Sequence, residues 1–138
     1  MPPTNENDPR MALNLEPHPE GGFFRRTYTA KDAVGDRPAV TLIHFYLPAG
    51  DTSAWHVVKS DEMWLWHGPG PLQIQLGGCG DEPDPGEVMT ISAKTPQALV
   101  PKNVWQRTLP SSEPVLVSCM VTPGFDFADF RLANEDKK

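Results

Sequence analysis

The sequence contains little cysteine, and this limits the structural roles that thiols could have. Its 138 residues include two cysteines, Cys79 and Cys119, without the Cys-x-x-Cys spacing that is typical of zinc sites. In a reducing compartment the pair is not expected to form a disulfide. Cys119 lies in an apolar strand pattern, and we expect it to be a small buried side chain.

The sequence also lacks a long apolar run and a basic cluster. Its apolar runs, such as residues 115–117, are far shorter than the roughly 20 residues that cross a membrane. Residues 1–10 are polar and contain no apolar core of a signal peptide. The formal net charge is −6 and the pI is about 5.1, which disfavours nucleic acid or an anionic membrane as partner. We therefore expect a cytoplasmic protein that binds neither.

Proline and glycine are abundant, with 16 prolines and 11 glycines. Proline breaks helix interiors, so a helical bundle is excluded. The chain is nevertheless 38% hydrophobic, with four tryptophans and six phenylalanines, which is enough to build a core. Short strands joined by proline- and glycine-rich turns predict an all-β sandwich or barrel.

The pattern along the chain predicts one domain over residues 13–132, a flexible N-terminal arm over 1–12 and a flexible C-terminal tail over 133–138. Residues 31–37 are polar and predict a loop, and residues 125–130 place an aromatic residue every two to three positions, as a clamp on the barrel edge would. Apolar alternation and β-branched residues predict strands over 23–29, 40–47, 53–58, 62–67, 72–76, 88–91, 98–101, 105–109 and 115–122.

The stretch from Gly50 to Gly68 is the most informative one for chemistry. His56 and Glu62 lie six residues apart across a predicted turn, so two strands that fold back on each other could bring both side chains to one cavity. An imidazole and a carboxylate are good ligands for a divalent metal. They could equally form a general base and the group that orients it.

This stretch resembles the first motif of the cupin superfamily, in which Gly50, His56, Glu62 and Gly68 match. The segment P-K-N-V-W-Q, residues 101–106, resembles the second motif. Two family histidines are replaced, one by Val58 and the other by Gln106. The resemblance implies His56, Glu62 and Gln106 as the ligands of a divalent metal ion, which two strong ligands and an amide oxygen would hold weakly.

A closer resemblance extends from about residue 13 to 132, over four motifs in order: L-E-P-H-P-E-G-G-F-F-R-R-T-Y, W-H-x-x-x-S-D-E-x-W, V-P-x-x-x-W-Q and V-x-P-G-F-D-F-x-D-F. Together they are similar to the cupin family called DUF985 or Cupin_5. Arg26 stands where that family often has a glutamate. The resemblance implies a double-stranded β-helix, or jelly-roll barrel, and a homodimer. It assigns no activity, because a shared fold does not give a shared function.

Strand parity adds a prediction about the cavity walls. If Glu62 points inward, Trp64 and Trp66 share its face, while Met63, Leu65 and His67 face outward. Gln106 joins the inner set, so two indoles and three polar groups could bind a small polar ring. Each tryptophan could equally be a core residue.

The strand over 23–29 presents one of two faces to the cavity, which carry either Arg25 and Thr27 or Phe24, Arg26 and Tyr28. Arg25 could hold a carboxylate or phosphate, and Tyr28 could donate a proton. Parity forbids both on a regular strand, and a β-bulge would relax that restriction. His18, between two prolines, is expected to stabilise its loop, and His44 and His67 are expected to have structural roles.

Three functions remain open from the sequence. The first is an isomerase- or epimerase-like enzyme that acts on a small polar or sugar-like substrate, with His56 as the base and Glu62 as its partner. The second is a cupin that binds a small ligand without catalysis, which the replacements at Val58 and Gln106 favour. The third is a metal-dependent cupin oxygenase or lyase.

Overall fold

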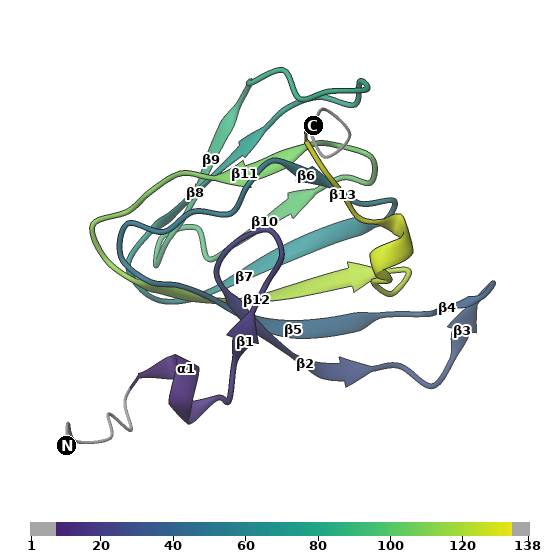
Figure 1. The fold of residues 1–138 in the computed structure, drawn as a ribbon, viewed down its shortest axis with the longest axis horizontal. Coiled ribbons are helices and arrows are strands. Elements are labelled where there is room, and N and C mark those ends of the chain that lie inside the picture. The colour runs from purple at the N-terminus through teal and green to yellow at the C-terminus, as the bar shows by residue number, and fades with distance from the viewer. Residues whose placement is uncertain (1–7, 134–138) are drawn as a thin grey trace.

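The larger of two facing sheets has six antiparallel strands, shown in the lower half of Figure 1. The order across this sheet is β1 (Glu16–Pro17), β2 (Phe23–Thr29), β5 (Thr41–Leu47), β12 (Val115–Thr122), β7 (Asp61–Pro69) and β10 (Gln97–Val100). Its central strands are rich in β-branched and aromatic residues, which suit a pleated and half-buried surface. The predicted ranges 23–29 and 115–122 coincide with β2 and β12.

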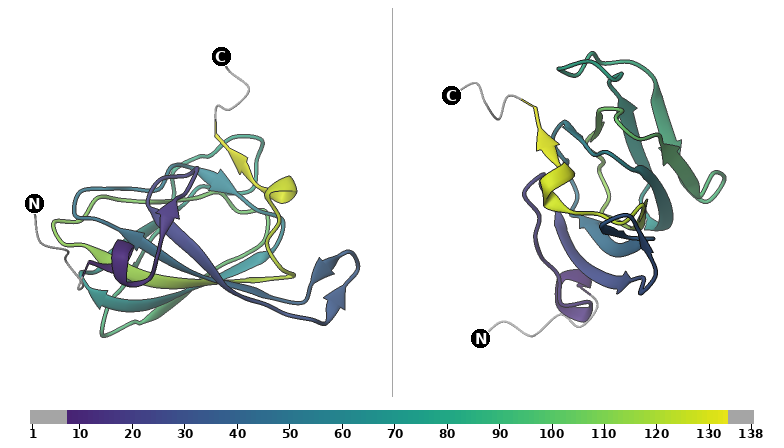
Figure 2. Two further views of the ribbon diagram at one scale, coloured as in Figure 1. Left: turned by 60° about the horizontal axis from the view of Figure 1, so that its bottom comes forward. Right: turned by 90° about the vertical axis from the view of Figure 1, so that its right-hand side faces the viewer.

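The second sheet has five antiparallel strands and packs over one face of the first, as the right-hand view of Figure 2 shows. Its order is β13 (Arg131–Leu132), β6 (His56–Val57), β11 (Gln106–Thr108), β8 (Leu72–Leu76) and β9 (Val88–Ile91). Strands far apart in the sequence are neighbours: β5 pairs with β12, and β6 pairs with β11. The chain therefore passes back and forth between the sheets, which confirms the predicted all-β jelly roll.

The computed structural model describes residues 8–133. In the predicted N-terminal arm, Pro9–Ala12 form a short helix, α1, which the Asp8 side chain caps. Residues 1–7 of this arm and residues 134–138 of the predicted tail lie outside the described range. The region predicted as a loop over 31–37 instead contains a short hairpin, β3 (Ala33–Val34) and β4 (Arg37–Pro38), which projects from the barrel (Figure 1). Among residues 8–133, no helix has the length and apolar character to span a bilayer.

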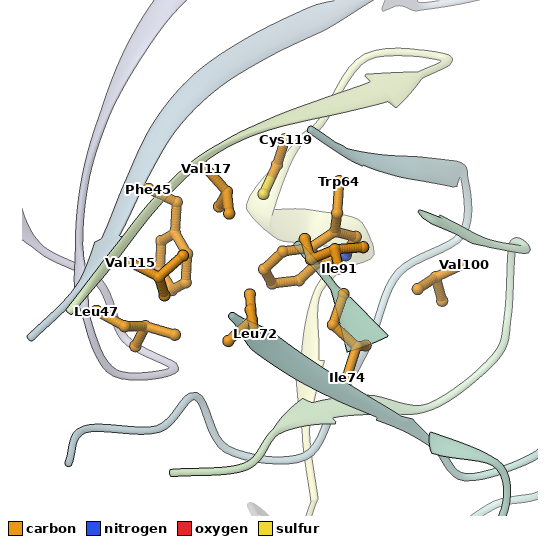
Figure 3. Close-up of a cluster of buried hydrophobic side chains, with 10 residues drawn as sticks. All are labelled: Phe45, Leu47, Trp64, Leu72, Ile74, Ile91, Val100, Val115, Val117 and Cys119. Atoms are coloured by element: carbon orange, nitrogen blue, oxygen red, sulfur yellow. The ribbon is translucent and has the colours of Figure 1, made fainter. Parts of the chain in front are cut away.

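The core fills the space between the two sheets. Alternate residues of β12, among them Val117 and Cys119, are buried against Leu72 and Ile74 of β8, as Figure 3 shows. Period-two alternation places one set of side chains on the inner face of each strand. Cys119 is buried as predicted, and both cysteines are free thiols.

The predicted clamp on the barrel edge is a short aromatic segment, residues 125–130, that contains the 3₁₀ turn η1 (Phe127–Asp129). It crosses from the end of β12 to β13 and so links the two sheets (Figure 2). Arg37 of β4 binds the Asp129 carboxylate through two hydrogen bonds of 3.0 and 3.1 Å and reaches Asp126 at 3.3 Å. Paired N–H groups hold a carboxylate with defined geometry, so Arg37 fixes this segment against the barrel.

Candidate functional site

A cavity opens between the inner face of the six-stranded sheet and the aromatic segment. Its apolar wall comes from β2, β5 and β12 and from three phenylalanines of that segment: Phe24, Ile43, Phe45, Val121, Phe125, Phe127 and Phe130. Its polar lining consists of His18, Glu20, Arg26, Thr41, His56, Glu62 and Cys119. The enclosed space is narrow, on the order of a few water molecules. A substrate can therefore place only a small group at the polar end.

Glu62 is held at the cavity wall by a chain of buried hydrogen bonds. The Gln106 Nε2 group donates to Glu62 Oε1 at 2.7 Å, and the Trp64 indole donates to Gln106 Oε1 at 2.9 Å. The indole N–H can only donate, so it determines which end of the Gln106 amide faces Glu62. The Cys119 thiol also hydrogen-bonds to Glu62. Two side chains from two other strands, Gln106 of β11 and Cys119 of β12, therefore contact one carboxyl group, and Trp64 fixes the first of them.

His56 and Glu20 form a second buried pair. The His56 Nδ1 atom lies 2.7 Å from the carbonyl oxygen of Ala54, and this oxygen can only accept, so Nδ1 carries the proton. The other ring nitrogen, Nε2, lies 3.3 Å from Glu20 Oε1. The imidazole also stacks on Phe130. The pair therefore has one proton to share between Nε2 and the carboxyl oxygen.

The loop that precedes β2 positions Glu20. The backbone N–H of Glu20 donates to His18 Nδ1 at 3.1 Å, and the Glu20 carbonyl accepts from the N–H of Ala54 at 2.7 Å. The next residue, Gly21, has φ +110°, and a Cβ there would collide with the Thr52 carbonyl. Only glycine adopts this conformation at such a close approach. The H-P-E-G-G sequence thus turns the Glu20 side chain into the barrel.

Burial and like charge set the protonation of these groups. Burial raises the pKa of Glu62 to about 7, against the hydrogen bonds from Gln106 and Cys119. Burial raises the pKa of Glu20 well above its usual value, and the nearby Glu62 charge adds to this effect. Burial lowers the pKa of His56 to about 4. At neutral pH the His56 imidazole is thus neutral and Glu62 is close to half ionised, while burial favours the protonated form of Glu20.

The remaining groups at the polar end are not nucleophiles at neutral pH. Burial raises the pKa of the Cys119 thiol well above its usual value, so the thiol stays protonated. Its S–H group donates a hydrogen bond to Glu62. Burial, with a smaller contribution from His56, lowers the pKa of His18 to about 4. Its ring lies among Phe24, Phe45 and Phe130 in edge contacts. His18 is therefore a neutral group that positions Glu20.

The structure brings together three of the residues that the sequence singled out: His56 and Glu62 line the cavity, and Gln106 holds Glu62. Trp64 is fully buried in the core behind Gln106 and does not line the cavity. Trp66 is partly buried, donates its indole N–H to the Gly70 carbonyl at 2.7 Å, and is also absent from the lining. Of the two interpretations for each tryptophan, the core position is the one observed.

Arg25 and Tyr28 both lie outside the cavity. A β-bulge in β2, between Arg26 and Tyr28, changes the register against β5. Arg25, paired with His44, faces outward by regular alternation with Phe24 and Arg26, and the bulge turns Tyr28, paired with Leu42, to the same outer face. The residue of β2 that lines the cavity beside Phe24 is Arg26.

The donor groups do not fit the divalent metal that the resemblance allows. The Gln106 oxygen accepts from Trp64, and its N–H group faces Glu62, so the amide cannot coordinate a metal between His56 and Glu62. Val58 contributes an apolar side chain where a ligand would be needed. Across residues 8–133, no group of three or more His, Cys, Asp or Glu side chains is placed to hold a metal ion.

Sequence reasoning missed Glu20, His18 and Cys119 as cavity residues, and it placed Arg26 on one of two possible inner faces without giving it a role. His18 and Glu20 are in the motif H-P-E-G-G, whose paired glycines signalled a special turn but not the direction of the carboxylate. Cys119 has the parity of an inward residue on its strand, as does Arg26 before the bulge. Parity was therefore the signal available for these two residues.

The fold and the cavity together define a small β-barrel that encloses titratable groups. Comparisons with known proteins agree with this barrel fold. Residues 11–133 match the model of the Cupin superfamily (DUF985) family, so the chain belongs to that family. No curated protein matches the chain.

Solved structures support the same assignment. The chain is 33% identical to a Shewanella oneidensis protein, with a TM-score of 0.84, covering 98% of this chain and 88% of that one. A hypothetical protein from Leishmania major is 26% identical, with a TM-score of 0.79, covering 93% and 86% of the two chains. A Klebsiella pneumoniae protein with a double-stranded β-helix domain, 18% identical over 88% and 92% with a TM-score of 0.64, shares the fold. The protein is thus a cupin with the double-stranded β-helix fold.

Proposed function

We propose that this cupin is an isomerase- or epimerase-like enzyme that moves a proton on a small, carbonyl-bearing, sugar-like molecule. The observation that carries the proposal is that Glu62, whose pKa is about 7, lines one narrow cavity together with the buried pair of Glu20 and His56, whose pKa values burial shifts in opposite directions. Groups whose surroundings separate their pKa values are suited to act as acid and base. A pKa near the working pH is best for proton transfer.

Each group has a defined part in this reaction. The Glu62 carboxylate removes a proton from the carbon beside the substrate carbonyl, and the electron pair of that C–H bond moves toward the carbonyl oxygen. The protonated Glu20, supported by His56 Nε2, donates a proton to that oxygen and gives an enediol. Return of a proton to carbon, with release of the hydroxyl proton to Glu20, completes an isomerisation or an epimerisation. No oxidant, reductant or metal is consumed.

This assignment changes the expected base. His56 has a pKa of about 4, and its Nδ1 is occupied by the Ala54 carbonyl. Such a histidine is a weak base at neutral pH, whereas Glu62 titrates in the right range. His56 therefore holds and orients the Glu20 proton, and Glu62 takes the substrate proton.

Solvent exchange tests the proposed function even where the product has not been identified. The protein is incubated in D₂O with small aldoses, ketoses and 2-oxo acids, and deuterium entry at carbon is followed by NMR. We expect Glu62→Gln to slow exchange on the active compound by about 10²- to 10⁴-fold, the usual contribution of a general base. Glu113→Gln, at an exposed glutamate, is the matched control and keeps the wild-type rate.

Two outcomes contradict the proposal. Exchange that persists in Glu62→Gln at the wild-type rate removes the carboxylate from the reaction. Binding of a compound from the panel with no deuterium entry identifies a ligand-binding cupin without catalysis, the alternative function.

We also propose that the homodimer implied by the family uses the outer face of the six-stranded sheet. Side chains of neighbouring strands meet there in register: Leu42 and Met63 flank Met120, and Leu99 pairs with Met63. Leu99 is 46% exposed and the other three are partly buried. An apolar patch with a polar rim is the usual composition of a subunit interface.

Light scattering on purified protein tests this interface. We expect a dimer for the wild type and a monomer for Met63→Asp, because an unpaired carboxylate would be desolvated at the centre of the contact. The matched control is Val88→Asp, at a 41% exposed apolar residue of the other sheet, and it should remain a dimer. A monomeric wild type, or a dimeric Met63→Asp, contradicts the proposed interface.

A further inference from the structure

Arg26 is the feature of the cavity that the proposed reaction does not use. It lies opposite Ile43 on the inner face of the sheet and lines the cavity beside Phe24, while the side chain itself is exposed at the mouth. Among the residues that line the cavity, it is the one lysine or arginine. Its position is therefore that of a fixed positive charge at an otherwise apolar entrance.

One hydrogen bond positions the Arg26 guanidinium and leaves other N–H groups of this side chain able to bind a ligand. Arg26 Nη2 donates to the carbonyl of Phe125 at 3.0 Å, where the aromatic segment begins. A guanidinium carries five N–H donors. In residues 8–133, Arg37 and Arg10 are bound to carboxylates, whereas no ion pair of Arg26 with a carboxylate is observed. The remaining N–H groups can thus bind an anionic oxygen from outside the protein.

The charge distribution of the cavity indicates how a substrate would be oriented. The polar end of the cavity, which we call the deep end, holds Glu20, His56 and Glu62, and burial there favours the uncharged form of each group. The wall between this end and Arg26 is aromatic and apolar. An anionic group would be poorly solvated at the deep end, next to a second negative charge, but would be paired at the mouth.

We infer that Arg26 binds the anionic group of the substrate at the cavity mouth, so that the substrate is a small carboxylate or phosphate ester whose uncharged end enters between Glu62 and Glu20. This inference rests on the proposed function for the identity of the reacting end. The anion site itself depends only on the position and free donors of Arg26. A carboxylate or phosphate can accept two parallel N–H bonds from one guanidinium.

Calorimetric titration with three probes tests the inference. Benzoate and phenyl phosphate offer a ring for the aromatic wall together with a carboxylate or a phosphate, and benzamide has the same ring without charge. We expect both anions, or one of them, to bind the wild type more tightly than benzamide. Arg26→Met should weaken binding of the anion by about 10- to 100-fold, as expected for loss of hydrogen bonds to a charged group.

The neighbouring arginine offers a matched control. Arg25→Met removes the same charge from the outer face of the same strand and should leave binding of the anion unchanged. Arg26→Lys should retain part of the affinity, because it keeps the charge but not the paired N–H geometry. Benzamide binding should be equal in the wild type and Arg26→Met, whereas a purely structural role of Arg26 would weaken it as well.

Three results overturn the inference: benzamide binds as tightly as the anions, Arg25→Met weakens the anions as much as Arg26→Met, or neither anion binds. The titration involves no turnover, so it is separate from the deuterium-exchange test. Exchange that depends on Glu62 without anion binding at Arg26 refutes only the anion site. Anion binding at Arg26 without exchange on any compound refutes only the proposed proton transfer.

Discussion

The Glu62→Gln variant is expected to lack the loss of stability that ionisation of Glu62 causes in the wild-type protein between about pH 4.5 and 7. Folded Glu62 has a pKa of about 7, against an ordinary value of 4.5. Between these values the folded state holds more protons than the unfolded state, so the free energy of unfolding falls as pH rises. At about 1.4 kcal/mol for each unit, this group accounts for a fall of about 3 kcal/mol.

The histidines oppose this trend at lower pH. His18 and His56 have folded pKa values of about 4, below the ordinary 6.5, so each contributes stability that increases with pH and is complete near 6.5. Above that pH only the buried carboxyls change the balance. Burial also raises the pKa of Glu20, so Glu20 adds to the fall in stability with rising pH. The contributions of the histidines and carboxyls overlap below pH 6.5, so the difference between Glu62→Gln and the wild type isolates Glu62, whereas the net curve does not.

Urea unfolding across the pH range measures the effect, with the difference between variant and wild type isolating Glu62. The difference should grow with pH and level off above about pH 8, where folded Glu62 is ionised. The exposed control Glu113→Gln should run parallel to the wild type. If Glu62→Gln also runs parallel, then Glu62 ionises at an ordinary pKa and is unsuited to be the base.

The Trp64→Ala variant is expected to lose about 3–5 kcal/mol of stability, the range found for large aromatic truncations in a packed core. Trp64 is 1% exposed and makes an edge contact with Phe45, with ring centroids 5.9 Å apart. Its removal also leaves the buried Gln106 oxygen without a donor. Proteins of this size have a free energy of unfolding of about 5–15 kcal/mol, so this loss is a large fraction of the total stability.

Two conservative variants separate packing from hydrogen bonding. Trp64→Phe keeps a ring against Phe45 but removes the indole N–H, and we expect a loss of about 1–3 kcal/mol. Trp66→Phe removes an N–H that serves the Gly70 carbonyl from a partly buried ring, and it should cost less than Trp64→Phe. Chemical denaturation monitored by circular dichroism compares the three. Equal losses for Trp64→Phe and Trp66→Phe would contradict a special role of the Gln106 contact.

Most strands were predictable because their signals are local. Alternation and β-branched residues placed β2, β8, β9 and β12 at their observed bounds. The strand predicted over 53–58 is shorter in the structure, where β6 covers only His56–Val57. Ser53 and Ala54 use their backbone groups for contacts with Thr108 and Glu20 rather than for a regular ladder.

The location of His56 and Glu62 in one cavity was predictable in part, since both residues belong to one motif on consecutive strands. The side chains that contact each of them were not predictable. Glu20 reaches His56 from 36 positions earlier in the chain, and Gln106 reaches Glu62 from 44 positions later. Such contacts depend on how the two sheets pack, and no local pattern encodes them.

The sequence by itself determined the class of fold, most of the strand pattern and the family, because proline and glycine placement, alternation and motif order are properties of the chain. Only the tertiary structure decided the direction of side chains at irregular positions. The bulge in β2 turns Tyr28 to the outer face that Arg25 also occupies, and the close turn at Gly21 brings Glu20 inward. Protonation was decided at the same level, because burial between the two sheets raises the carboxyl pKa values and lowers those of His18 and His56.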